Sequence, residues 1–399
     1  MRLLILSDSH VIEKEGIYFS PDPWLKITEY LEPFFSRVCL CIPVEQTCEP
    51  PSSIPLNRSW EQKRIHWKHT IAYKSVVNYY KLLPYIVANN LPVVVDAVRD
   101  CDAVFMRLPA MNGYMTALVA RLLGKPLVCY FSGDQRLQII NGGKYRGLWY
   151  LPARMAAVFH DFLYQRIVKG SIASLFEGDL ILKRYASTDN NSYFMFPSLI
   201  EEREIWSRQQ SSLQEPPRNL LFAGSLDKAK GIDFLLEALA HLVLCGIECR
   251  LTICGEGPEG NALKQLTNHL GLADRVSFRG HVKWGKDLDE VYRETDILIH
   301  PSLSEGVPKV ILEAMAKGVA IVATAVGGVP GVITDADNGI LVQPKSSRAI
   351  SDAVIKLVRV QGLRNQLVQG GYAFIKQHTA EKQAKEVATI ILESVKNST

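Results

Sequence analysis

The 399-residue sequence lacks any apolar run near the ~20 residues that a membrane-spanning helix requires. Its opening residues, MRLLILS, are too short an apolar stretch for a signal peptide, and they lead directly into Asp8 and His10, as a first strand and its loop would. A large excess of positive charge is also missing: the formal net charge is +4, which argues against a nucleic-acid partner. We therefore expect a cytoplasmic globular protein with about two domains.

Patterns typical of metal sites are also scarce. The eight cysteines lie mostly within apolar runs, as small buried side chains do in a reducing compartment. Cys245 and Cys249 have the spacing of half a metal site, but no second pair of cysteines completes it. Asp-x-Asp pairs at 100–102 and 335–337 stand before a strand and within a turn, where acids commonly serve the loop itself. The sequence thus predicts no bound metal and no cofactor.

The C-terminal half alternates apolar, β-branched runs with amphipathic helical patterns. Such alternation predicts an α/β domain with a parallel sheet covered on both faces, and sheets of this kind bind ligands beyond the carboxyl ends of their strands. The predicted strands lie at 218–226, 248–257, 274–282, 296–302, 319–328 and 339–344.

The N-terminal half repeats this alternation less regularly, with strands expected at 2–8, 37–44, 103–109, 126–133, 170–178 and 193–198. Periodicity is lost over 198–218, which ends in two prolines and indicates a domain boundary. We predict one domain over 1–200 and a second over 201–375. Residues 376–399 form a predicted terminal helix that crosses back to the first domain.

The most informative motif is HPSLSEGVPKVILEAMAKG, residues 300–318. Pro308 suits a first helical turn and Gly318 a helix end, so Glu305 falls in the loop before the helix and Glu313 on it. Two carboxylates facing one cleft could accept hydrogen bonds from sugar hydroxyls, while the helix N-terminus offers N–H groups to a diphosphate. The alternative is a surface helix with an incidental pair of glutamates.

Two loops that follow predicted strands complete the picture. In FAGSLDKAKG, Lys230 could neutralise a phosphate, although lysines in loops are usually solvated. CGEGPEG, at 254–260, matches G-x-G-x-x-G, but the acid that a dinucleotide site needs ~20 residues later is missing. We therefore interpret Gly255 and Gly257 as allowing close approach of the backbone to a ligand.

These blocks together resemble the donor domain of glycosyltransferase family 4, the retaining enzymes of GT-B fold, over residues 218–375. SEGVPKVILEAMAKG resembles the Glu-x7-Glu motif of that family in its E-G-x-P variant, and FAGSLDKAKGIDFLLEAL resembles its strand-Gly-Arg-Leu…Lys-Gly block. The resemblance implies two Rossmann-like, doubly wound domains facing a central cleft. The N-terminal domain would bind the acceptor and the C-terminal domain a nucleotide sugar.

The resemblance also implies roles for individual residues. Glu305, with the backbone of the following four residues, resembles the group that holds donor sugar and phosphates; Glu313 resembles the ribose ligand and Lys230 the diphosphate ligand. The loops at 255–257 and 282–283 match the nucleobase region. The implied donor-binding set is Gly224, Ser225, Lys230, Gly255, Gly257, Val282, Lys283, Glu305, Gly306, Val307, Pro308, Lys309 and Glu313.

The chain departs from the family pattern at several points. Ser225 stands where an arginine is usual, so one phosphate cation is missing unless Lys228 or Lys309 substitutes. Gly331 replaces a common glutamate, and Ser132 stands where many members have histidine. The glycine-rich loop that usually follows the first strand is absent.

The implied activity is metal-independent, retaining transfer of a hexose-type sugar from a UDP-, GDP- or ADP-sugar. The acceptor would be a glycan, a lipid-linked molecule or a small molecule, in bacterial surface polysaccharide or glycolipid synthesis. Lys230 and Glu305 are the catalytic candidates on the donor side. Asp134 and His10 lie in loops after N-terminal strands and could orient the acceptor; the alternative is that each is an ordinary loop or capping residue.

The stretch from Arg58 to Lys81 mixes basic and aromatic residues. It predicts either a patch lying on an anionic membrane surface, which would make the protein peripheral on the inner face of the cytoplasmic membrane, or a solvated helix with an aromatic face on the core. Two other functions remain open: a nucleotide-sugar epimerase of the same architecture, and a catalytically degenerate binding subunit.

Overall fold

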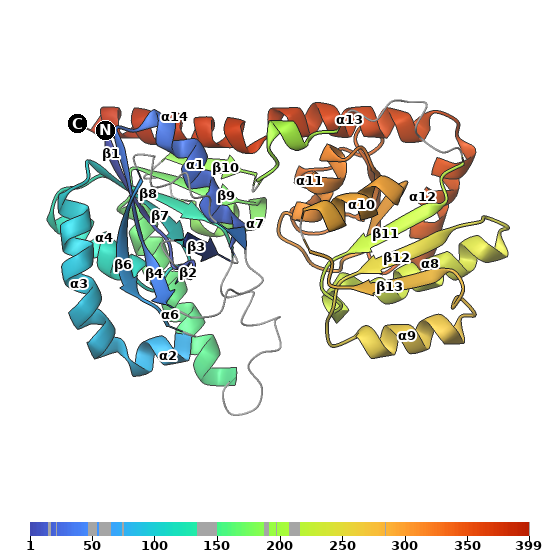
Figure 1. The fold of residues 1–399 in the computed structure, drawn as a ribbon, viewed down its shortest axis with the longest axis horizontal. Coiled ribbons are helices and arrows are strands. Elements are labelled where there is room, and N and C mark those ends of the chain that lie inside the picture. Colours follow the sequence, from blue (N-terminus) through green and yellow to red (C-terminus); the bar gives the residue numbers. More distant parts are fainter. Residues whose placement is uncertain are drawn as a thin grey trace. The chain divides into compact units, whose positions relative to one another are not determined.

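The computed structural model describes the whole chain except residues 15–16, 21, 47–53, 56–64, 74–75, 134–149, 187–190, 197, 207–215, 284 and 399. The chain forms two compact units. The N-terminal unit combines Met1–Leu199 with Ala380–Thr399, and the C-terminal unit spans Ile200–Thr379 (Figure 1).

The C-terminal unit is built on a sheet of six parallel strands in the order β13-β12-β11-β14-β15-β16. Each strand lies within a range predicted from the sequence. The strands are β11 (Asn219–Ala223), β12 (Arg250–Cys254), β13 (Val276–Gly280), β14 (Ile297–His300), β15 (Ala320–Thr324) and β16 (Ile340–Val342).

Helices cover both faces of this sheet. They are α8 (Ile232–Leu244), α9 (Gly260–His269), α10 (Lys286–Glu294), α11 (Lys309–Ala316), α12 (Ser347–Arg359) and α13 (Leu363–Gln377). In α8, Leu235, Leu236, Leu239 and Leu242 recur at helical spacing and enter the core. Short 3₁₀ turns lie at Glu202–Glu204, Lys228–Lys230 and Val329–Gly331.

A buried ion pair fastens α13 to the sheet. Nη1 of Arg364, a residue only 1% exposed, lies 2.8 Å from Oδ1 of Asp296, just before β14. The other carboxylate oxygen of Asp296 accepts from the backbone N–H groups of Arg218 and Asn219 at 2.9 and 3.0 Å. Both oxygens are thus satisfied, as a buried carboxylate requires.

The described residues of the N-terminal unit contain ten strands in one sheet, ordered β10-β9-β8-β7-β1-β4-β2-β3-β5, with β6 also paired to β4. Six were predicted: β1 (Arg2–Leu6), β4 (Arg37–Gln46), β7 (Ala103–Leu108), β8 (Leu127–Phe131), β9 (Ala173–Glu177) and β10 (Asn191–Met195). Four were not predicted: β2 (Val11–Lys14), β3 (Ile17–Ser20), β5 (Ile54–Pro55) and β6 (Ile65–Ile71).

Strand β6 corrects the interpretation of the basic and aromatic stretch as one helix. It pairs with β4, and the ring of its Trp67 stacks on Tyr18 of the β2–β3 hairpin at 4.0 Å. Lys68 forms an ion pair with Asp96. Among the described residues of the stretch, the helical part is α2 (Val76–Lys81). Arg58, with residues 59–64 and 74–75, lies outside the described residues.

Two helical layers cover the central strands, because alternate residues of β1 point to opposite faces. Leu3 and Ile5 pack with α1 (Ile27–Leu31) and α14 (Ala380–Ser398); Leu4 and Leu6 pack on the other face. That second layer contains α3 (Leu83–Arg99), α4 (Gly113–Leu122), α6 (Tyr150–Lys169) and α7 (Asp179–Tyr185). The 3₁₀ helices η1 (Pro23–Lys26) and η2 (Glu32–Phe34) flank α1.

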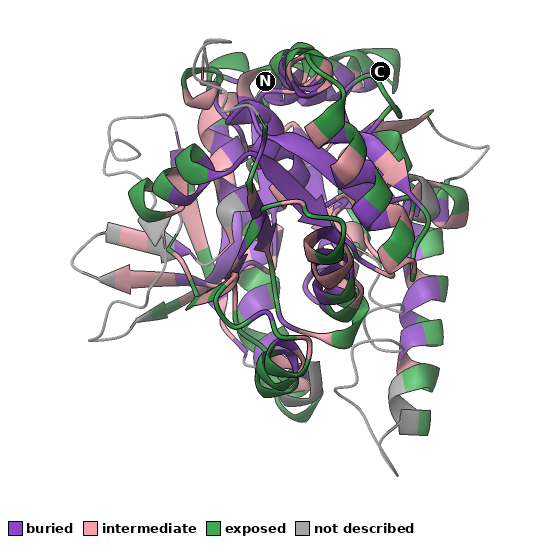
Figure 2. Cartoon of the chain, turned by 90° about the vertical axis from the view of Figure 1, so that its right-hand side faces the viewer, coloured by how far each residue is buried: buried purple, intermediate pink, exposed green. Residues whose placement is uncertain are grey.

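The terminal helix expected from residue 376 begins at Ala380, since α13 continues to Gln377. Apolar residues of α14, including Val387 and Ile391, pack in the core of the N-terminal unit. In Figure 2 the strands are mostly purple, while helices are purple on one side and green on the other. None of the helices in the described part of the chain is long and apolar enough to cross a membrane.

Candidate functional site

The loops after β11 and β14 meet at the carboxyl edge of the C-terminal sheet. The backbone N–H of Leu303 donates to the carbonyl oxygen of Ala229 at 2.7 Å, which joins the two loops directly. This bond brings Lys230, at the end of the first loop, beside Glu305 in the second. The lysine ammonium lies 2.5 Å from Oε1 of Glu305. Two residues that are 75 positions apart in the sequence therefore form one ion pair.

Three groups converge on this single oxygen of Glu305. Besides Lys230, the hydroxyl of Ser302 donates to Oε1 at 2.7 Å, and Nε2 of His300 lies 3.0 Å away without the alignment of a hydrogen bond. Both His300 and Ser302 are buried. The second oxygen, Oε2, accepts no hydrogen bond from any described residue. Glu305 is thus held through one oxygen and presents the other.

The end of β15 and the loop after it contact the backbone of the loop that carries Glu305. The hydroxyl of buried Thr324 donates to the carbonyl oxygen of Ser302 at 2.5 Å. Gly327 follows, and a β-carbon there would lie 1.8 Å from the carbonyl oxygen of Glu305, so only glycine fits. The N–H of Gly328 then donates to Gly306 at 3.0 Å. The backbone of the Glu305 loop is therefore fixed on both sides.

Burial alone would raise the pKa of Glu305, but His300 and Lys230 outweigh it and lower the pKa to about 2. The side chain is only 12% exposed. Glu305 is therefore a carboxylate at neutral pH, and its open oxygen is a strong acceptor for hydroxyl groups.

Glu313 lies one helical turn into α11. Its Oε2 accepts from the hydroxyl of Tyr292 at 2.9 Å, and among described residues nothing donates to its Oε1. Burial raises the pKa of Glu313, and the hydrogen bond from Tyr292 partly offsets this rise. The pKa of Tyr292 is held well above its usual value, first by burial and then by the neighbouring carboxylate of Glu313. The two glutamates of the motif thus share a feature: each keeps one oxygen without a protein donor.

Helix α11 begins next to Glu305 with no side-chain cap at Pro308. The N–H groups of Gly306, Val307 and Lys309 donate to no acceptor within the described ranges. Unsatisfied N–H groups at a helix start carry partial positive charge and suit an anion. The side chain of Lys309 is exposed at the same place.

The sequence analysis interpreted Gly255 and Gly257 as allowing a ligand to approach the backbone, but the structure places another protein loop there. A β-carbon at Gly255 would lie 1.8 Å from the carbonyl oxygen of Gly224, and one at Gly257 would lie 2.4 Å from that of Leu226. The close neighbour at both positions is therefore the adjacent protein loop. Glycine here lets the two loops pack closely, and the N–H of Leu226 donates to the backbone carbonyl oxygen of Glu256 at 3.0 Å.

The remaining predicted donor-side residues lie at this same sheet edge. The hydroxyl of Ser225 donates to Asp227 at 2.6 Å, and Asp227 also accepts from the backbone at the start of the Lys228–Lys230 turn. Val282 is half-buried and Lys283 is exposed, just after β13.

The sequence did not identify His300, Ser302, Thr324 or Tyr292 as parts of the site. His300 and Ser302 belong to the quoted motif, and their approach to Glu305 depends on how the loop turns. Tyr292 comes from α10, and only the packing of α10 against α11 brings it to Glu313.

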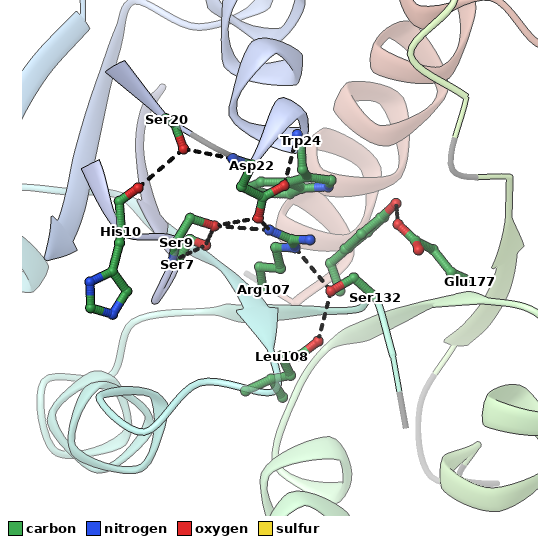
Figure 3. Close-up of polar contacts among 11 residues, drawn as sticks. Ser7, Ser9, His10, Ser20, Asp22, Trp24, Arg107, Leu108, Ser132 and Glu177 are labelled. Atoms are coloured by element: carbon green, nitrogen blue, oxygen red, sulfur yellow. Dashed lines mark hydrogen bonds and ion pairs between the residues drawn. The ribbon is translucent and has the colours of Figure 1, made fainter. Parts of the chain in front are cut away.

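On the N-terminal side, the structure does not bring the imidazole of His10 into a polar cluster, although its carbonyl oxygen accepts from the hydroxyl of Ser20 at 3.2 Å. Its imidazole packs edge-on against Tyr73, with ring centroids 5.5 Å apart, and points away from Arg107 in Figure 3. Asp134 lies outside the described residues. Asp8, two positions before His10, accepts from the Tyr73 hydroxyl and from Nδ2 of Asn112 at 3.1 Å.

A polar cluster lies instead around Arg107, where β1, β7 and β8 end (Figure 3). Its Nη1 donates to Ser9 at 2.9 Å and pairs with Asp22, and its Nε donates to Ser132 at 2.9 Å. The guanidinium carbon lies 4.6 Å from the ring centroid of Trp24. Burial opposes ionisation of Asp22, but Arg107 outweighs it and lowers the pKa. The departure noted at Ser132 therefore belongs to this cluster.

In each Asp-x-Asp pair, one acid is engaged by a group of the protein. Asp102 pairs with Arg2 at 2.7 Å, and Oδ1 of Asp335 accepts from the N–H of Leu341 at 2.9 Å. No group of three or more His, Cys, Asp or Glu side chains in the described ranges is arranged to hold an ion. Cys245 is exposed whereas Cys249 is buried.

Comparison with known proteins agrees with this geometry. Residues 204–374 match the family model described as Glycosyl transferases group 1. An uncharacterized glycosyltransferase of Methanocaldococcus jannaschii is 31% identical over 190 residues, which cover 47% of this chain and 48% of that protein. N-acetyl-alpha-D-glucosaminyl L-malate synthase of Bacillus anthracis is 29% identical over 200 residues, covering 48% and 51% respectively. The chain thus spans about half the length of these curated relatives.

Solved structures extend the likeness to both units. HepE from Anabaena, in complex with UDP, has a TM-score of 0.70 at 16% identity, covering 98% of this chain and 100% of that one. HepE also has a structure in complex with UDP-glucose. At this identity the likeness concerns the fold, and it shows that the chain has the GT-B fold of two α/β domains, with a parallel sheet in one and a mainly parallel sheet in the other.

Proposed function

We propose that the chain is a retaining glycosyltransferase that takes a hexose-type sugar from a nucleoside-diphosphate sugar bound at the carboxyl edge of the C-terminal sheet. One observation carries this proposal: Glu305 is held by Lys230 and Ser302 through one oxygen and keeps the other open. A purely structural carboxylate gains nothing from an unused, partly buried acceptor. The similarity of residues 204–374 to group 1 glycosyl transferases supports the same conclusion.

The open oxygen of Glu305 is suited to a sugar hydroxyl. It belongs to an ionised carboxylate with a pKa of about 2, and hydrogen bonds to charged acceptors are roughly twice as strong as neutral ones. Because Oε1 is fixed by its neighbours, Oε2 has a defined position. We propose that it accepts from a hydroxyl of the donor sugar and so aligns the anomeric carbon.

The diphosphate would bind between Lys230 and the start of α11. The lysine ammonium has three N–H groups, and one of them donates to Glu305. The other two, with the N–H groups of Gly306, Val307 and Lys309, can donate to phosphate oxygens. Negative charge grows on the leaving diphosphate during transfer, and preorganised donors stabilise it at that moment. These groups supply that stabilisation from the protein itself.

Glu313 would bind the ribose through Oε1, the oxygen that Tyr292 leaves open. Gly224, Ser225, Gly255, Gly257, Val282 and Lys283 lie along the same edge, and we propose that this end receives the nucleobase. HepE, which shares the fold, has been crystallised with UDP and UDP-glucose, which makes a uridine nucleotide the first to test.

The acceptor would be deprotonated by the departing phosphate, so retention requires no strong general base. We propose a glycan, lipid-linked or small-molecule acceptor bound by the N-terminal unit, in surface polysaccharide or glycolipid synthesis in the cytoplasm. His10 and Asp134 stay candidates for orienting it, although the imidazole of His10 packs against Tyr73.

The test begins with binding. UDP, GDP and ADP, each alone and as the glucose conjugate, are titrated by calorimetry into the protein and into Glu305→Gln. We expect one nucleotide sugar to bind, and Glu305→Gln to weaken the sugar conjugate at least ~10-fold more than the bare diphosphate. Glu290→Gln, an exposed residue on α10, is the matched control and should bind as the parent does. Equal losses for both ligands would contradict a sugar-binding role.

The second step identifies the chemistry. The bound donor is incubated with candidate acceptors, and the anomeric configuration of donor and product is compared by NMR. Retained configuration and full activity with a chelator present are the expected results. An epimerised donor without transfer would establish the epimerase alternative, and tight binding without any turnover would establish a binding subunit.

A further inference from the structure

Helix α6 presents a row of large apolar side chains outward. Leu151, Met155, Val158, Phe159 and Phe162 are each between 50% and 67% exposed. At about 100° per residue they fall within an arc of about 100° on the helix surface. In Figure 2, exposed and buried residues lie on opposite sides of several helices. A contiguous apolar row of this kind on a surface helix indicates an interaction site.

The opposite side of α6 is fixed to the core, so the row cannot turn inward. His160 is buried and meets two tyrosine hydroxyls, with Tyr80 2.8 Å from Nε2 and Tyr114 at Nδ1. The next residue, Asp161, accepts from the hydroxyl of Tyr185. These polar contacts set the rotation of the helix about its axis. The outward apolar row is therefore a built feature of the fold.

The exposed charged residues of α6 have one sign. Arg154, Arg166 and Lys169 are exposed, whereas Asp161 is buried and is the one carboxylate on α6. The guanidinium of Arg166 lies over the ring of Phe162, 5.1 Å from its centroid. An apolar face flanked by cations matches the boundary between acyl chains and anionic headgroups. An ordinary surface helix would instead carry charges of both signs.

We propose that α6 lies in the interface of an anionic lipid bilayer, with Met155, Phe159 and Phe162 inserted among the acyl chains and Arg166 and Lys169 at headgroup phosphates. The row from 151 to 162 is about 17 Å long, enough to rest along a membrane plane. Because β8 and β9 are parallel, α6 starts at the carboxyl edge of the sheet. The membrane contact therefore begins at the edge where Arg107 and Ser132 lie.

This surface differs from the basic stretch at 58–81, whose Lys68 is paired with Asp96 and whose Trp67 packs on Tyr18. It is also independent of the proposed transfer reaction, because lipid binding needs no nucleotide.

The test is flotation of the full chain with vesicles of phosphatidylcholine alone and with added phosphatidylglycerol, without nucleotide. We expect binding to the anionic vesicles, lowered at least ~10-fold by the combined changes Met155→Ser, Phe159→Ser and Phe162→Ser. The matched control is Leu118→Ser with Leu122→Ser on α4, which are 59% and 75% exposed and should bind as the parent does. Circular dichroism and melting temperature confirm that both variants fold.

Charge and self-association are tested separately. Arg166→Gln with Lys169→Gln should weaken binding to anionic vesicles several-fold and remove most of its dependence on salt. Absence of parent binding, or equal binding by the α6 serine variant, would overturn the proposal. So would light scattering that shows a dimer converted to monomer by the same serine changes, because a second copy would then cover this face. Nucleotide titration of the serine variant should remain unchanged, which separates this proposal from the transferase proposal.

Discussion

Glu305 and Glu313, at the carboxyl edge of the C-terminal sheet, are hydrogen-bonded differently from Asp8 and Asp22 at the carboxyl edge of the N-terminal sheet. In the N-terminal unit, both oxygens of Asp8 and both oxygens of Asp22 accept hydrogen bonds from the protein. In the C-terminal unit, Glu305 and Glu313 each have one oxygen that accepts from the protein and one that does not, within the described residues. Of these four carboxylates, the two at the C-terminal edge each keep one oxygen that a ligand could use as a hydrogen-bond acceptor.

The cations follow the same division. Arg107 is held by Asp22, Ser9, Ser132 and the face of Trp24, which uses most of its planar donor set. Among the described residues, the ammonium of Lys230 bonds to Glu305 alone. A cation fixed by many partners organises a loop, whereas one with spare donors can bind an anion. Hydrogen-bond donors and acceptors without a protein partner, more than charge itself, therefore distinguish a ligand-binding sheet edge from a purely structural one.

Removing the cation of the C-terminal edge should have the largest effect. Lys230→Ala is expected to lower the transfer rate about 100- to 1000-fold, because one preorganised donor to the leaving group is typically worth that much. Initial rates with saturating acceptor measure it. Lys228→Ala, an exposed lysine in the same turn, should change the rate less than about twofold. Similar losses in both variants would show that the turn acts only through its overall charge.

The two glutamates should respond to pH with opposite signs. The folded-state pKa of Glu305, about 2, is below the ordinary 4.5, so Glu305 adds stability at neutral pH that disappears as the pH falls from about 4.5 through 2. The shift corresponds to about 3 kcal/mol. Glu305→Gln should therefore lower the unfolding free energy at neutral pH, and the difference from the parent should close in acid.

Glu313 reverses this expectation. Burial raises its pKa, so the fold favours its neutral form, and ionisation at neutral pH costs stability. Glu313→Gln should raise the unfolding free energy of the ligand-free protein at neutral pH, and the gain should vanish below a pH of about 4.5, where the unfolded chain is also protonated. Urea titrations of both variants at several pH values provide the measurement. A lower unfolding free energy of Glu313→Gln at neutral pH would contradict the expected opposite behaviour of the two glutamates.

Asp22→Ala should reveal the structural character of the N-terminal edge. It deprives Arg107, Ser9 and the backbone N–H of Trp24 of an acceptor, which should cost about 2 kcal/mol of unfolding free energy. Nucleotide-sugar binding to the C-terminal unit should not change. Asp102→Ala removes an exposed pair with Arg2 and should cost less than about 1 kcal/mol. If Asp22→Ala weakened donor binding as Lys230→Ala does, the two edges would not differ as argued.

The smallest effect is expected from adding a charge to the binding edge. Ser225→Arg restores the cation common in the resembling family and breaks one hydrogen bond, from Ser225 to Asp227. Because the position is exposed, we expect the affinity for the nucleoside diphosphate to rise only about two- to fivefold. Calorimetry against Ser225→Gln, which is similar in length and uncharged, isolates the contribution of charge.

Sequence reasoning located the C-terminal unit well, because its strands are short apolar runs separated by clear helix starts and ends. The helix predicted after the glutamate loop is α11, Lys309–Ala316, and Gly318 follows it as expected. The N-terminal unit was harder. Helix α3 contains Pro92, which usually interrupts a helix, and β6 combines Trp67 and two histidines with apolar residues, which hides the alternation.

The sequence by itself determined the alternating α/β architecture and identified Lys230 and Glu305 as separate candidates, because periodicity and motif spacing are local properties of the chain. Only the tertiary structure decided which oxygen of Glu305 stays open, that Tyr292 contacts Glu313, and that the apolar face of α6 points outward. These features depend on contacts between residues far apart in the chain. Hydrogen-bond satisfaction and helix rotation are set when elements pack, and no local pattern encodes them.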